Sequence, residues 1–209
     1  MKKANFADVL ALIRKSGKIT RKEIEAKTGF SWGAVSTITN RLLQEKYITE
    51  HKCKSQRSAG RTPSCLEMNS EEYLILGIDV NISGFTASLI NLKGEVTAAN
   101  SRTPSFTDKD SLLEEILSFA KESLMLAGSV TVIGIGVAMQ GTVDSKNGIS
   151  VSIPHCKDWS DVPLVYILNK QLGIPVFIEH DPDCILYDVS AKQVYKNAVL
   201  LRIDNGIGM

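Results

Sequence analysis

The sequence predicts two domains of different class, an α+β head over residues 1–69 and an α/β domain over residues 70–209. The head has apolar residues at helical spacing, whereas the second domain has near-continuous apolar runs between amphipathic segments. The charge divides at the same place. Residues 1–69 hold 14 lysines and arginines against 6 aspartates and glutamates, a net +8, and residues 70–209 hold 10 against 17, a net −7. A basic head on an acidic body suggests that the head binds a polyanion, with chance clustering of solvated charges as the alternative.

Three short helices are predicted in the head. Apolar residues at positions i, i+3, i+4 and i+7 from Phe6 predict a first helix that ends near residue 16. The four residues from Thr20 match a capping box, which opens a second helix running to about residue 28. Gly29 supplies the left-handed residue that a tight turn needs, and Ser31 caps a third helix. Three helices with a glycine-containing turn between the last two match the helix-turn-helix pattern.

The third helix carries the residue types that read DNA. If its apolar residues face inward, its outer face presents small and polar side chains that fit a major groove. An asparagine and an arginine on this face can bond base edges, and the hydroxyl groups can bond phosphate. The side chains predicted to contact DNA from this segment are Ser31, Trp32, Ser36, Thr37, Asn40 and Arg41.

A basic hairpin, or wing, is predicted after the third helix. Residues 47–50 form one strand and residues 64–68 the returning strand. The stretch between them carries cations that indicate phosphate contacts, namely Lys52, Lys54, Arg57 and Arg61. A three-helix head could instead be a protein-interaction module, but such a module has no need of this cationic stretch. The run Gly-Arg-Thr-Pro at 60–63 has two interpretations, a cation on a stiff turn that enters a minor groove or a bent linker.

The order of elements after residue 69 is that of an actin-like, ribonuclease-H-type lobe. Strands are predicted at 73–80, 85–91 and 95–99, then a helix at 111–127, a strand at 130–139, a helix at 162–172, a strand at 175–178, a helix at 182–194 and a strand from 198. Such lobes occur in pairs around a nucleotide and sugar cleft. The expected fold is therefore an α+β winged helix-turn-helix followed by one α/β actin-like lobe, with the second lobe missing.

Several segments, taken together, resemble the ROK family of repressors, uncharacterised reading frames and sugar kinases. Residues 19–24, 29–31 and 35–36 resemble the winged helix of its repressor branch, and residues 58–63 resemble the Gly-Arg-x-Pro linker of those repressors. Residues 134–137 followed by 141–144 are similar to the family's second glycine-rich segment, and residues 159–164 and 174–181 continue the match. The resemblance implies a sugar-responsive transcriptional repressor that binds double-stranded DNA as a homo-oligomer.

The resemblance also implies a sugar pocket, in which Asp181 matches the residue that acts as catalytic base in the kinases. The residues that it places around this pocket are Gly141, Thr142, Ser152, Ile153, His180 and Asp181. The residues by themselves leave another interpretation open. In that interpretation Asp181 and Asp183 stabilise a helix N-terminus, and His180 is a polar residue at a strand end.

Three departures argue against the alternative function, a sugar kinase that transfers phosphate from ATP to a hexose. The family's phosphate loop, Asp-x-Gly-Gly-Thr, is replaced at residues 79–84 by a run with side chains where glycines let backbone amides approach phosphate. His180 stands where the kinases usually carry asparagine, and the family's zinc motif would lie beyond Met209. We therefore expect no enzyme activity, no cofactor and no metal site. A regulator that no longer responds to a ligand is a third hypothesis.

The four cysteines, Cys53, Cys65, Cys156 and Cys184, are scattered and form no C-x-x-C pair. They are expected to be free thiols in a reducing compartment rather than a metal site or a disulfide framework. No stretch reaches the ~18 apolar residues of a membrane span, and the basic N-terminus lacks the apolar core of a secretory signal. These features predict a cytoplasmic protein.

Overall fold

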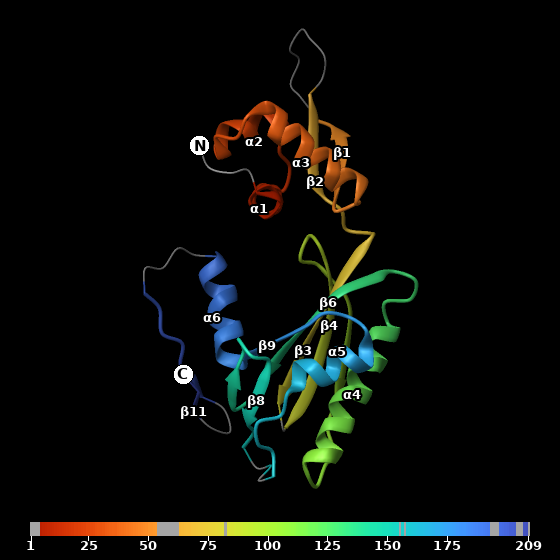
Figure 1. Ribbon diagram of the computed structural model, residues 1–209, viewed down its shortest axis with the longest axis vertical. Coiled ribbons are helices and arrows are strands. Elements are labelled where there is room, and N and C mark those ends of the chain that lie inside the picture. Colours follow the sequence, from red (N-terminus) through yellow and green to blue (C-terminus); the bar gives the residue numbers. More distant parts are fainter. Residues whose placement is uncertain are drawn as a thin grey trace. The chain divides into compact units, whose positions relative to one another are not determined.

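The computed structural model describes residues 5–53, 63–81, 83–154, 156, 158–192, 197–203 and 207–208 of the chain (Figure 1). The chain divides into two compact units. The first unit comprises Met1–Tyr73 together with Asn91–Glu95, and the second comprises Leu74–Ile90 with Val96–Met209. No helix within the described residues is both long and apolar enough to cross a membrane.

Three helices make up most of the first unit: α1 (Phe6–Ser16), α2 (Arg21–Thr28) and α3 (Trp32–Gln44). The capping box predicted at the start of α2 is confirmed. Thr20 accepts a hydrogen bond from the Glu23 amide, and the Glu23 carboxylate accepts one from the Thr20 amide at 2.8 Å. Gly29 ends α2 in the left-handed conformation, with a φ of 71°, as the tight turn to α3 requires.

A two-stranded antiparallel sheet follows, formed by β1 (Ile48–Lys52) and β2 (Ser64–Met68). Ile19, in the connection between α1 and α2, exchanges two backbone hydrogen bonds with Leu66, so the sheet is joined to the helical part. The helices and the sheet enclose one apolar core, whose fully buried members include Val9, Ile13, Ile24, Val35, Leu42 and Leu66. Burial of these side chains is the main favourable term holding the unit together.

The expectation of four free thiols is wrong, because Cys53 and Cys65 form a disulfide. The hairpin register produces their approach. Cys65 pairs with His51 in the ladder, and Cys53 follows β1 with its amide donating to the Pro63 carbonyl. The two Cα atoms are 5.2 Å apart, within the range that a disulfide spans. Because the pairing depends on this register, no local cysteine motif announces it.

The second unit is built on a five-stranded sheet in the order β5-β4-β3-β6-β9. Its strands are β3 (Tyr73–Asn81), β4 (Gly84–Asn91), β5 (Val96–Arg102), β6 (Thr131–Met139) and β9 (Val176–His180). β4 and β5 pair antiparallel, whereas β6 and β9 pair parallel. A small hairpin that the sequence did not predict, β7 (Thr142–Asp144) and β8 (Ile149–Ser152), follows β6.

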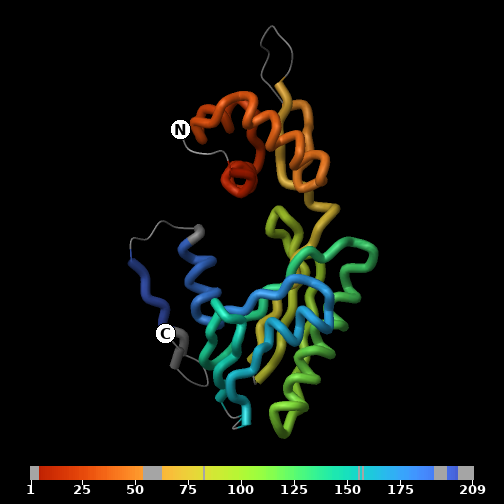
Figure 2. The backbone as a smooth tube through the Cα atoms, in the orientation of Figure 1, coloured from red at the N-terminus to blue at the C-terminus, as the bar shows by residue number. Residues whose placement is uncertain are grey.

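The helices of the second unit are α4 (Lys109–Met125), α5 (Leu164–Leu172) and α6 (Asp181–Lys192). The predicted order of an actin-like sheet is present, and the chain can be followed through it in Figure 2. Apolar side chains of α4, α5 and the sheet form one core, among them Leu76 of β3, Ile116 and Phe119 of α4, and Leu168 of α5. Two short strands, β10 (Arg202–Ile203) and β11 (Ile207–Gly208), pair antiparallel.

Candidate functional sites

α3 has one buried face and one exposed face. Val35, Thr39 and Leu42 are buried in the core of the first unit. The exposed residues among the predicted DNA contacts are Ser31, Trp32, Thr37, Asn40 and Arg41, whereas Ser36 is half-buried. Trp32 is 53% exposed, at the N-terminal end of the helix. The predicted contact residues of α3 therefore share one solvent-facing surface, which Ser36 reaches only in part.

Arg21, at the start of α2, holds two side chains of α3 in place. Its Nε donates to Thr39 Oγ1 at 3.0 Å, and its Nη2 donates to Asn40 Oδ1 at 3.3 Å. Its Nη1 donates to Glu50 Oε1 on β1 at 2.6 Å, which lowers the pKa of Glu50 below its ordinary value. The carboxamide oxygen of Asn40 is thus engaged within the protein, and its NH₂ group is the part of the side chain that can donate to a ligand.

The sequence did not single out Arg21. It lies one position after a helix cap, where a cation has no special meaning, and its partners are 18 to 29 residues away. Only the pairing of α2 with α3 and β1 reveals that it fixes Asn40.

Arg41 is held differently, although it is exposed. Its Nε is 2.7 Å from Glu45 Oε1, one helical turn further along α3. Its guanidinium carbon lies 5.3 Å from the centroid of the Phe6 ring on α1, a cation–π contact. Arg41 must leave both partners before it can bond a base, so Asn40 is the better placed of the two neighbours.

The predicted cations of the hairpin are only partly within the described structure. Lys52 is exposed and ends β1, opposite Ser64. Lys54, Arg57 and Arg61 lie outside the described residues. Lys52 is therefore the one predicted phosphate contact of this group to which the described structure assigns a position.

Three basic side chains of the first unit lie close to the carboxylate of Glu67 on β2. His51 Nε2 is 3.1 Å from Glu67 Oε1, and Lys18 Nζ and Lys93 Nζ are 3.8 and 3.5 Å from Glu67 Oε2. The Glu67 side chain is 15% exposed, so its charge is offset by these neighbours more than by water. This network occupies the strand that carries Cys65.

The structure brings four of the predicted sugar-binding residues together on the β7–β8 hairpin. Thr142 pairs with Ser152, and Gly141 and Ile153 flank that pair in the chain. Gly141 has a φ of 98°, and a Cβ atom built on it would lie 2.1 Å from the Ser152 carbonyl oxygen. Only glycine fits here, because both the backbone conformation and the close approach exclude a side chain.

The other two predicted residues, His180 and Asp181, stand where β9 ends and α6 begins. The parallel pairing of β6 with β9 puts Met139 opposite His180, so the ends of both strands lie at the same edge of the sheet. His180 Nε2 is 3.6 Å from Asp181 Oδ1, and His180 Nδ1 is 3.5 Å from Asp183 Oδ2. Asp181 is 7% exposed, as a residue that faces into the unit.

A cavity of about 940 Å³ lies on the second unit, and none of the six predicted sugar-binding residues lines it. Its walls include Gly77 of β3, Gly136 of β6 and Lys146 of the turn between β7 and β8. Glycines at these strand positions leave room above the sheet. They are the sequence feature that could have indicated this cavity. Glu179 and Cys184 also line it, on either side of His180 and Asp181 in the chain.

This end of the sheet is acidic. Burial first, and then the carboxylates of Glu179, Asp181, Asp183 and Asp79, raise the pKa of the Cys184 thiol. Within the described residues no group of histidines, cysteines and carboxylates is arranged to hold a metal ion.

The Asn81 side chain, at the end of β3, bonds the backbone and the side chain of Ser83. Asn81 Oδ1 accepts from the Ser83 amide at 3.0 Å and from the Ser83 hydroxyl at 2.7 Å. Asn81 is itself buried. The backbone amide of Ser83 is therefore already bonded to a side chain.

The model of the ROK family matches residues 75–209 of this chain. A xylose repressor from Bacillus spizizenii is 30% identical over the whole chain, which covers 55% of that protein. A glucokinase from Thermotoga maritima is 26% identical over 64% of this chain and 43% of its own length.

Among solved structures, a ROK family transcriptional regulator described as a homologue of the Escherichia coli MLC protein superimposes with a TM-score of 0.83. It is 25% identical, and the match covers 98% of this chain and 52% of that one. The similarity to the regulators thus includes the first unit, whereas the glucokinase match covers about two thirds of the chain. The chain spans about half the length of the regulators that it matches.

Proposed function

The chain belongs to the ROK family, and from that premise we propose that it is a DNA-binding transcriptional repressor of carbohydrate-utilisation genes. The observation that carries the proposal is the basic first unit, with net charge +8 over residues 1–69, whose helix α3 exposes small and polar side chains. The similarity to a xylose repressor over the whole chain supports it.

In this proposal residues 1–69 are a winged helix-turn-helix, and residues 70–209 are the first lobe of an actin-like domain. α2, the turn at Gly29 and α3 form the helix-turn-helix, with α3 in the major groove. The β1–β2 hairpin is the wing, and its cations contact phosphates beside the groove. This arrangement uses the one face of α3 that the core leaves exposed.

The contacts divide into two classes. Trp32 and Asn40 read base edges, since they are exposed on α3 and are not held in an ion pair. The hydroxyl residues Ser31, Ser36 and Thr37 bond the backbone of the DNA, and the cations Lys52, Lys54, Arg57 and Arg61 neutralise phosphates. Arg41 contributes after it has left Glu45.

The proposed effector is a sugar or sugar phosphate bound near the ends of β6 and β9. The residues assigned to it are Gly141, Thr142, Ser152, Ile153, His180 and Asp181. A homo-oligomer in the cytoplasm fits this function, because a two-fold protein binds two half-sites one helical turn apart. A rise in melting temperature with xylose or glucose, and none with the sugar alcohol, would support the assignment.

The test of the main proposal is a gel shift with duplex DNA from the region upstream of the gene. We expect retardation at low salt that weakens steeply as the salt concentration rises, because phosphate contacts release counterions. Absence of retardation at low salt, or retardation that does not change with salt concentration, would contradict the proposal.

The similarity to glucokinases and the buried Asp181 favour one other function, phosphate transfer from ATP to a hexose. We propose that the chain has no such activity. The Ser83 amide is bonded to Asn81, and acidic side chains gather at the end of the sheet. Hexose phosphate formed by the wild-type chain but not by Asp181→Asn would contradict this.

A further inference from the structure

We propose that the Cys53–Cys65 disulfide is a reversible redox site that exchanges with low-molecular-weight thiols and disulfides. Its oxidised form holds the end of the β1–β2 hairpin in the conformation that binds DNA, and this second part rests on the proposed function. The bond joins two cysteines that flank residues 54–64 in the sequence, the stretch that carries Lys54, Arg57 and Arg61.

The disulfide lies on the outer face of the hairpin. Ile48, Leu66 and Met68 alternate along the strands and are buried in the core of the first unit. Cys65 belongs to the opposite face, and both Cys53 and Cys65 are half-buried. In this proposal a small thiol reaches the sulfur atoms from that face, and reduction leaves the core side chains in place.

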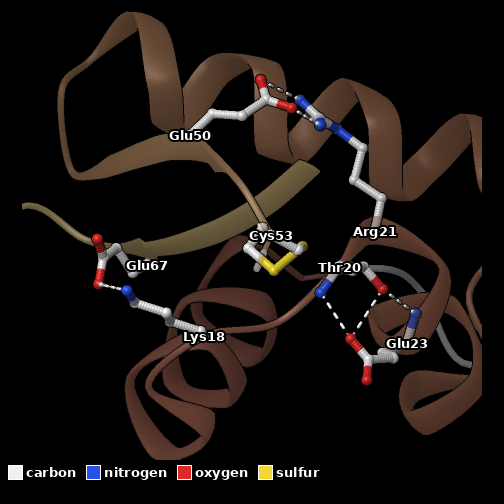
Figure 3. The surroundings of a disulfide bond; sticks show 8 residues. Lys18, Thr20, Arg21, Glu23, Glu50, Cys53 and Glu67 are labelled. Carbon is white, nitrogen blue, oxygen red and sulfur yellow. Dashed lines mark hydrogen bonds and ion pairs between the residues drawn. A yellow bond between two sulfur atoms is a disulfide. The ribbon is translucent and has the colours of Figure 1, made fainter. Parts of the chain in front are cut away.

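The charges around the pair favour exchange. The carboxylates nearest in the strands would hinder thiolate formation if they were unpaired, but Glu50 accepts a hydrogen bond from Arg21 and Glu67 forms an ion pair with Lys18 (Figure 3). His51 stands directly opposite Cys65 in the ladder and on the same face. His51 Nε2 is also 3.1 Å from Glu67 Oε1. In this proposal Cys65 starts the exchange, because it is the cysteine that has an imidazole as its ladder partner.

The chemistry is a two-step thiol–disulfide exchange. The Cys65 thiolate attacks one sulfur of a small disulfide RSSR, forming a mixed disulfide and expelling RS⁻. The Cys53 thiolate then attacks the Cys65 sulfur and expels the second RS⁻. Two protein thiols are oxidised, one RSSR is reduced to two RSH, and the protons pass from the cysteines to the leaving thiolates. Excess RSH drives the same steps backwards, which is the expected state of a reducing cytoplasm.

The disulfide restrains the end of the β1–β2 hairpin that carries Lys52, one of the proposed phosphate contacts. The last ladder pair is Lys52 with Ser64, and the last backbone hydrogen bond runs from the Cys53 amide to the Pro63 carbonyl. Strand ends open readily, and a covalent link across this end keeps both interactions closed. Lys52 is then held in place before it meets a phosphate. Pre-ordering one cationic side chain raises affinity by about 2- to 12-fold.

The experiment equilibrates the whole chain in glutathione buffers from fully reduced to fully oxidised. Mass spectrometry after alkylation counts the free thiols, and fluorescence anisotropy measures affinity for a random-sequence duplex at low salt. Cys184→Ser is the matched control, because it removes a thiol outside the pair. We expect oxidised wild type and oxidised Cys184→Ser to bind several-fold more tightly than their reduced forms. Cys53→Ser/Cys65→Ser should bind like reduced wild type in every buffer.

The outcomes separate this inference from the proposed function. If neither redox form binds DNA, the proposed function fails, while the thiol count still shows whether the site is reversible. If both forms bind DNA equally, the proposed function stands and the redox control is overturned. Failure of the pair to close at any glutathione ratio overturns the redox site itself.

Discussion

Asn40 and Arg41 are neighbours on α3, but their side chains are held in different ways. The oxygen of Asn40 accepts from Arg21, which fixes the rotamer and leaves two N–H donors for a base. Arg41 is held by Glu45 and the Phe6 ring, so a contact with DNA costs it both interactions. A site that is already ordered loses less entropy on binding.

Replacing Asn40 by alanine should therefore weaken specific binding by about 1–3 kcal/mol, the usual value of a base contact. Replacing Arg41 by alanine should weaken specific binding less. The Arg41 guanidinium must first break its contacts with Glu45 and Phe6, so its net contribution to DNA binding is smaller. Anisotropy titrations against an operator and a random duplex measure both effects. A larger loss for Arg41→Ala than for Asn40→Ala would show that Arg41 is the principal reader.

Gly141 is the residue whose replacement the structure constrains most. Alanine at this position would place its Cβ against the Ser152 carbonyl at a positive φ of 98°. We expect Gly141→Ala to lower the free energy of unfolding by about 1–3 kcal/mol, as measured by urea denaturation. Gly136→Ala is the control, because its Cβ would meet no atom within 4 Å. Equal stability of the two variants would contradict the close approach.

For single residues, the sequence predicts which side chains are exposed better than it predicts which side chains they contact. The exposed set on α3 follows from helical periodicity, since Val35 and Leu42 define the inner face. The Arg21–Asn40 contact and the Cys53–Cys65 bond could not be predicted, because each depends on how separate elements pack.

The contacts of Arg21 with Glu50, Thr39 and Asn40 connect two helices and a strand of the first unit. Glu50 has a lowered folded-state pKa, so its stabilising effect is complete above the ordinary glutamate pKa of about 4.3. It is lost as the pH falls through the lower folded value. Glu50→Gln should cost about 0.5–1.5 kcal/mol of unfolding free energy at pH 7 and nothing once wild-type Glu50 is protonated. Urea unfolding at pH 7 and at acidic pH compares the two, and a difference that persists in acid would rule out the ion pair as its cause.

Elements with a strong local signal were predicted well. The capping box opens α2 at the predicted residue, and the five strands of the sheet lie close to their expected ranges. The β7–β8 hairpin was missed because its strands are only three and four residues long, too short for an alternation to be visible. β1 runs two residues beyond its expected end, to Lys52, and this extension is what brings Cys53 to Cys65.

For the whole molecule, the division of charge is the property that the sequence shows most directly. The net charge near zero hides a basic part and an acidic part. The cavity of the second unit was not predicted, because its walls come from strands and turns that share no motif. The net charge of a segment can be counted from the sequence, whereas a cavity forms only when separate elements pack together.

The same division predicts how affinity responds to salt. Lys52 is exposed at the end of β1 and is proposed to neutralise one phosphate. Lys52→Gln should weaken specific and random duplexes by the same factor, and reduce the slope of log K against log salt by about 0.9. Asn40→Ala should leave that slope unchanged, since a neutral side chain releases no counterion. Anisotropy titrations at four or more salt concentrations give the slopes. If both variants changed the slope equally, the separation of α3 as reader and hairpin as phosphate contact would be wrong.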